Sequence, residues 1–137
     1  MKRAICLALL ALLTGCTEAY FEAVTVPPPN RVAELDAEEA SARVSVGVAL
    51  AFECTYGTAP CADARISSDD GGVASVFPAY VDLLSDTIVD SDGQRVGKKS
   101  RTVFVLLGVR EGSTKVKVEY DADGDEAEQS FEVEVVP

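Results

Sequence analysis

Apolar residues occupy every second position over several segments of this chain, which is the period of a β-strand with one buried face. The longest such segment runs from Val44 to Cys54 and contains Gly47. It predicts one long strand, or two strands that meet at the glycine. The same pattern returns in three later sets, each predicted to face the core: Val103, Val105 and Leu107; Val116, Val118 and Tyr120; Phe131, Val133 and Val135.

Turn-forming residues separate these segments. Asp121–Asp125, which contains Gly124, predicts a hairpin between the last two strands. Residues 32–42 could be taken for a short helix, but we expect an edge strand and a turn there. Short strands with frequent turns and no convincing amphipathic helix predict an all-β fold, an antiparallel sandwich of about seven strands.

The first fifteen residues follow another pattern. A basic start is followed by a ten-residue apolar run, Ala4 to Leu13. This run is too short to cross a hydrocarbon core of about 30 Å, and it predicts a secretory signal peptide at residues 1–15. The next residues, Leu13-Thr14-Gly15-Cys16, resemble the lipobox of bacterial lipoproteins. The resemblance implies that Cys16 carries the lipid, becomes the first mature residue and holds the protein on the membrane.

The resemblance to lipoproteins also implies a location. Thr17 rather than Asp follows the cysteine, which in Gram-negative relatives implies transfer to the outer membrane. Pro27-Pro28-Pro29 favours an extended backbone. We therefore expect residues 16–30 to form a tether that reaches up to about 45 Å from the headgroups, and residues 31–137 to form the domain.

Composition narrows the possible functions. The 137 residues carry a net charge of −11, and cleavage before Cys16 would remove Lys2 and Arg3 and make it −13. Such a charge argues against a nucleic-acid partner. The chain has no histidine, which excludes the Ser-His-Asp and Cys-His catalytic arrangements and the usual histidine-ligated zinc sites. We therefore expect no enzyme activity and no cofactor.

Two cysteines remain in the mature chain once Cys6 leaves with the signal and Cys16 takes the lipid. An even pair in an exported protein predicts a disulfide between Cys54 and Cys61, across a turn-rich segment of six residues. The alternative is a redox or metal pair, but the spacing does not match the CxxC motif.

A second resemblance concerns the domain. Its signals are Arg43–Gly47, Ser67–Asp70 with Val73–Val76, Gly108–Val118 and Phe131–Val135. These segments resemble the bacterial Ig-like domains of invasins and intimins, over about residues 31–137. The resemblance implies an Ig-like sandwich without catalytic residues. The connection from Val76 to Thr102 is longer than that family usually has.

Two charged segments are candidate binding sites. Asp121, Asp123, Asp125 and Glu132 match EF-hand positions, but Glu126 stands where that loop needs glycine. We expect a solvated turn and no tight metal site; weak calcium binding remains the alternative. The long connection carries four basic residues within seven positions: Arg95, Lys98, Lys99 and Arg101. They would bind an acidic protein or a phosphorylated glycan, or simply keep an edge strand from pairing with neighbours.

The favoured function is a non-enzymatic, lipid-anchored envelope or cell-surface protein whose Ig-like domain binds a protein or glycan, or acts as a spacer. One alternative is a lipoprotein subunit of an envelope assembly. The other is a small lipid-anchored hydrolase; if it hydrolysed glycosides, it would need two carboxylates facing one cleft.

Overall fold

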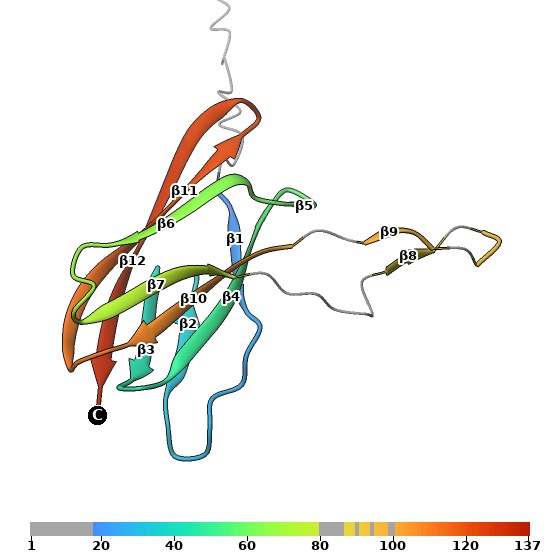
Figure 1. Ribbon diagram of the computed structural model, residues 1–137. Helices are drawn as coiled ribbons and strands as arrows, with labels where there is room; N and C mark the ends of the chain where they lie inside the picture. The colour runs from blue at the N-terminus through green and yellow to red at the C-terminus, as the bar shows by residue number, and fades with distance from the viewer. Residues whose placement is uncertain (1–17, 80–86, 90, 94, 99–100) are drawn as a thin grey trace, which may run out of the picture.

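The protein is a β-sandwich, shown in Figure 1 as a computed structural model that describes residues 18–79, 87–89, 91–93, 95–98 and 101–137. Sheet A has the order β1 (Tyr20–Ala23), β4 (Ala49–Tyr56), β10 (Thr102–Gly108), β7 (Ala74–Ala79), with β5 (Ala59–Pro60) paired to β4. Sheet B has the order β2 (Ala33–Asp36), β3 (Ser41–Ser45), β12 (Asp125–Val136), β11 (Gly112–Ala122), β6 (Ala62–Ser68). A separate ribbon pairs β8 (Thr87–Val89) with β9 (Arg95–Lys98). The prediction of an all-β sandwich is confirmed.

The part of the chain that the structure describes contains no helix. It accordingly offers no helical segment of the length and apolarity needed to cross a membrane.

The core lies between the two sheets and is centred on aromatic rings. Phe52 and Phe104 come from sheet A, and Phe131 comes from sheet B. The Phe52 ring lies 5.9 Å from that of Phe104 and 6.3 Å from that of Phe131, centroid to centroid. Each ring is almost fully buried, so these contacts join the two layers through a large apolar area.

The longest alternating segment forms two strands. β3 ends at Ser45 in sheet B and β4 begins at Ala49 in sheet A. Gly47 lies between them with φ 76°, a conformation that glycine adopts without steric cost. The glycine therefore marks the place where the chain passes from one sheet to the other, and the two-strand interpretation is confirmed.

The acidic hairpin is also confirmed. β11 and β12 pair along their full length up to Ala122 and Asp125, leaving a two-residue turn. Both turn residues, Asp123 and Gly124, have positive φ (59° and 92°), as such tight hairpins require. The predicted edge strand and turn in residues 32–42 are confirmed as well, because β2 lies at the edge of sheet B.

The predicted tether of residues 16–30 is wrong from Ala19 to Ala23, which belong to the sandwich. Tyr20–Ala23 forms β1, which pairs antiparallel with β4, and Phe21 is only 3 % exposed. The proline run lies beyond β1, in the connection that leads to β2 in sheet B. Prolines restrict only their own part of the backbone, whereas burial of the Phe21 ring holds β1 against the core. The domain therefore begins at least twelve residues before the predicted boundary at Arg31.

One strand pair departs from the predicted antiparallel arrangement. β3 runs parallel to β12, with Val44 opposite Val135. Only strands joined by a tight hairpin must be antiparallel. β3 and β12 are far apart in the sequence, so no turn constrains their relative direction.

The predicted inward face of β10 is also wrong. Phe104 and Leu106 belong to the core, opposite Phe52 and Leu50 of β4. Val103, Val105 and Leu107 occupy the other face, where Val103 is still buried, at 2 % exposure, and the other two are half-buried. Residues 103–107 are apolar at every position, so periodicity alone does not identify the buried side. The neighbouring strand decides it.

Candidate functional site: the outer face of sheet A

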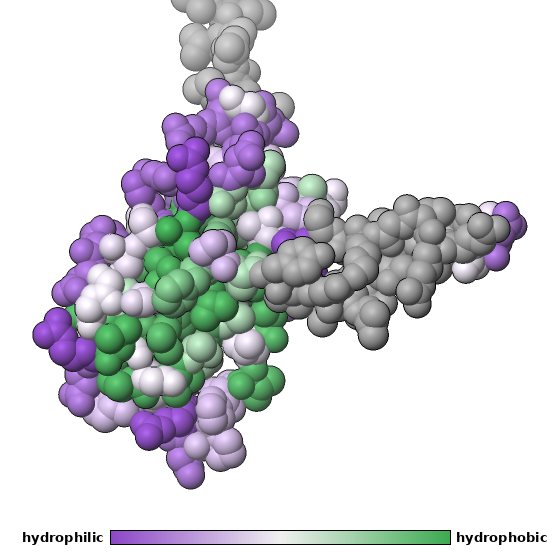
Figure 2. Space-filling view, viewed as in Figure 1, coloured by the Kyte–Doolittle hydropathy of each residue, from purple (hydrophilic) through white to green (hydrophobic). Residues whose placement is uncertain are grey.

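The outer face of sheet A is apolar over three adjacent strands. Its centre is Val105 of β10, which lies opposite Phe77 of β7 on one side and Ala51 of β4 on the other. The next row joins Leu107 to Ala49. Figure 2 shows these apolar residues gathered over β7, β10 and β4, facing the viewer. Because Phe77 is 49 % exposed, a large aromatic ring is left in contact with water.

One ion pair borders this apolar face. Arg101 donates from Nε to Glu53 Oε2 over 2.7 Å, and both side chains are largely buried, at 19 % and 21 % exposure. Glu53 lies opposite Val103 in the sheet. The pair neutralises the carboxylate on this surface, since charge-assisted hydrogen bonds of this kind are strong when partly shielded from water.

The outer face of sheet B is different in character. Salt bridges join β3 to β12 through Arg43 and Glu134, over 3.0 Å, and β11 to β12 through Lys115 and Glu132, over 3.2 Å. These side chains are about half exposed and behave as an ordinary solvated surface. The sandwich therefore has one charged face and one apolar face. An apolar patch bordered by polar groups is typical of a protein interaction site.

The predicted basic binding site is only partly described. Arg101 is engaged by Glu53 on the border of the apolar face. Arg95 and Lys98 belong to β9, and Lys99 lies outside the described residues. Recognition of an acidic partner by these residues therefore stays a prediction, in which Arg101 already has a structural role.

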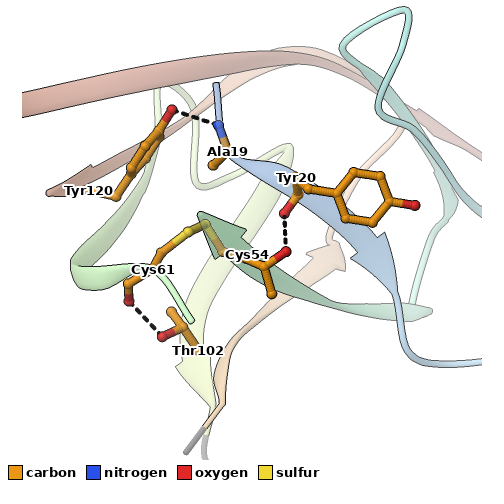
Figure 3. Close-up of a disulfide and its surroundings, with 7 residues drawn as sticks. Ala19, Tyr20, Cys54, Cys61, Thr102 and Tyr120 are labelled. Atoms are coloured by element: carbon orange, nitrogen blue, oxygen red, sulfur yellow. Dashed lines mark hydrogen bonds between the residues drawn. A yellow bond between two sulfur atoms is a disulfide. The ribbon is translucent and has the colours of Figure 1, made fainter. Parts of the chain in front are cut away.

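The cysteine pair forms the predicted disulfide. Cys54 at the end of β4 is bonded to Cys61, with Cα atoms 5.5 Å apart, and both residues are buried. Figure 3 shows the hydrogen bond by which the Thr102 hydroxyl donates to the Cys61 carbonyl, over 2.7 Å. The disulfide thus closes the β4–β5 turn, and the Thr102 hydrogen bond ties this turn to β10, so the role of the cysteine pair is structural. Cys16 lies outside the described residues.

The acidic hairpin uses its carboxylates within the fold. Asp121 accepts a hydrogen bond from the Gly124 backbone over 2.9 Å, and Asp123 accepts one from the Tyr56 hydroxyl over 3.1 Å. The pKa of the Tyr56 hydroxyl is raised, mainly by desolvation and to a smaller extent by the hydrogen bond to Asp123. Within the described ranges, no group of three or more acidic or cysteine side chains is arranged to hold a metal ion.

A shallow depression of about 230 Å³ lies beside this hairpin, and its lining includes Glu119, Asp121 and Glu126. Hydrolysis of a glycoside would need one carboxyl group held protonated. The hydrogen bond and charge of Lys117, whose Nζ lies 2.8 Å from Glu119, lower the pKa of that carboxyl group instead. The arrangement favours an ionised Glu119, which is unsuited to act as a general acid.

Among solved structures, three chains match this one, including two that belong to an S-layer protein. No protein-family model and no curated protein matches the sequence. The crystal structure of domains 4 and 5 of the S-layer protein SbsC is similar with a TM-score of 0.49 and 24 % identity, covering 79 % of this chain and 54 % of that one. The structure of SbsC domains 5–6 gives a TM-score of 0.48 and 24 % identity, covering 78 % and 45 %. The chain thus spans about half the length of these structures, and similarity at this level assigns no function.

The apolar outer face was missed by the sequence analysis. Its signal is the uninterrupted apolar run of residues 103–107. A strand with two apolar faces is expected where both faces are covered. In this sandwich the second sheet covers only one of them.

Proposed function

We propose that this chain is a non-enzymatic, lipid-anchored protein of the bacterial envelope, and that its sandwich binds a protein partner through the outer face of sheet A. The observation that supports binding is the exposed ring of Phe77 beside the half-buried Val105. The buried centres of protein interfaces are apolar and poor in charged residues, as this face is. A glycan would need hydrogen-bonding side chains, which the Val, Leu and Ala rows do not offer.

The anchor in this proposal is a lipid on Cys16 in the outer membrane. Support for export comes from the disulfide, because such bonds persist in oxidising compartments outside the cytosol. A Cys16→Ser variant is expected to leave the membrane fraction or to accumulate unprocessed. Metabolic labelling with a palmitate analogue provides the direct assay, and an unlabelled wild-type protein would contradict the lipoprotein assignment.

Binding is tested by crosslinking the lipidated protein in its own envelope and recovering the partners. The test variant is Phe77→Ser with Leu107→Ser, which makes the outer face polar without touching the side chains of the core. The matched control is Glu132→Ser with Glu134→Ser on the outer face of sheet B. We expect the first variant to lose the partner and the control to retain it.

Equal recovery of the same partners by both variants would exclude the outer face as the binding site. Recovery of no partner by the wild-type protein would favour a spacer.

A further inference from the structure

The N-terminal strand holds the start of the mature chain firmly. β1 pairs with β4 over residues 20–23, with Phe21 opposite Cys54. Just before the strand, the Ala19 backbone donates a hydrogen bond of 2.9 Å to the Tyr120 hydroxyl, shown in Figure 3. Ala19 itself is buried. The chain is therefore fixed to the sandwich from Ala19 onward.

Only two residues, Thr17 and Glu18, separate Ala19 from Cys16. An extended chain spans at most about 3.6 Å per residue, so the Cα atoms of Cys16 and Ala19 lie no more than about 11 Å apart. This short reach replaces the tether of about 45 Å that the proline run suggested. A lipid on Cys16 would place Ala19 next to the headgroup layer.

Ala19 lies at the end of the sandwich that carries the acidic hairpin. Tyr120 belongs to β11 just before the turn, and Glu18 lines a cavity together with Ala122 and Asp125. Figure 1 shows β1 beginning at this end and the C-terminus at the opposite end. The strand β12, twelve residues long, connects the two ends over about 40 Å.

We infer that the anchored domain stands on the lipid surface with the β11–β12 hairpin end facing the headgroups. This inference rests on the lipid anchor proposed above. The strands then run away from the membrane, and the outer face of sheet A points sideways along it. A partner on that face is a protein held on or in the same membrane, within one domain length of the lipid.

Electrostatics provides a second readout for this orientation. The hairpin end carries Asp121, Asp123 and Asp125, so anionic headgroups repel it. The reach of about 11 Å is close to the Debye length of about 10 Å at 0.1 M salt, so the short linker does not take these charges out of range. The hairpin end should therefore lie farther from the lipid surface in anionic vesicles at low salt, and it should move closer again when salt is raised.

The test uses the full-length lipidated protein in phosphatidylcholine vesicles that contain a headgroup-attached quencher. A genetically encoded fluorescent amino acid replaces Asp125 at the hairpin end or, as the matched control, Glu111 in the exposed turn at the other end. We expect several-fold stronger quenching at position 125 than at position 111. A third variant inserts fifteen Gly/Ser residues between Thr17 and Glu18, and it should remove most of this difference.

The outcomes separate the orientation from the anchor. If the protein floats with the vesicles but both positions are quenched equally, or position 111 more strongly, the orientation is wrong and the anchor stands. If the wild-type protein neither incorporates the palmitate analogue nor floats with vesicles, the proposed anchor and the orientation both fail.

Discussion

Replacement of Phe21 by alanine is the most informative test of how this domain is built. The ring lies between the sheets, with its centroid 4.9 Å from that of Phe131 at an interplanar angle of 82°, and 6.2 Å from that of Phe52. Such edge-to-face contacts contribute beyond the buried area alone. If β1 belongs to the folded domain, removal of this ring must leave a cavity among the central aromatic residues.

The expected loss follows from comparable substitutions. Phe-to-Ala changes in protein cores cost about 3–5 kcal/mol. β1 lies at the edge of sheet A, where neighbouring side chains can close part of the cavity, so we expect about 3 kcal/mol. For a domain of this size, that corresponds to a fall in Tm of about 12 °C.

The assay is thermal and urea denaturation of the chain that lacks residues 1–16, with unfolding monitored by circular dichroism. Tyr20→Ala is the matched control, because the side chain is on the same strand and 62 % exposed. It should change stability by no more than about 1 kcal/mol. A Phe21→Ala variant as stable as this control would refute the placement of β1 in the core and restore a tether at the N-terminus.

Three further outcomes are expected. Intact-mass measurement should find Cys54 and Cys61 resistant to alkylation until they are reduced, and replacing both by serine should cost about 2.5 kcal/mol, as expected for closing a loop of eight residues. Gly108→Ala should lower stability by about 2 kcal/mol or more, since a Cβ there would lie 2.5 Å from a backbone carbonyl oxygen; an unchanged Tm would contradict this. Lys117→Gln should raise the pKa of Glu119, measured by NMR titration, because the Lys117 hydrogen bond and charge lower it. The stabilisation from this exposed pair is fully present above the unfolded-state pKa of Glu119 and is lost as the pH falls through the lower folded-state pKa. It also weakens as salt is added. An unchanged Glu119 pKa in the variant would contradict the assignment.

The sequence alone determined the local features of this protein. A period of two over Val44–Cys54 and Val116–Tyr120 specifies strands, because alternate side chains of a strand point to opposite faces. The Asp123-Gly124 turn follows from residues that tolerate positive φ. The disulfide partners followed from elimination, since Cys54 and Cys61 are the two cysteines left after the signal and lipid assignments.

Only the tertiary structure decided which apolar side chains are covered. The apolar run of residues 103–107 could turn either face inward, and pairing with β4 brought Phe104 to the core and left Val105 outside. Phe21 likewise has no periodic neighbours that mark it as buried, yet it packs against Phe131 from the other sheet. Both outcomes depend on contacts between residues distant in sequence, which local periodicity and propensity do not specify. The candidate binding face and the short distance from Cys16 to the sandwich follow from these two contacts.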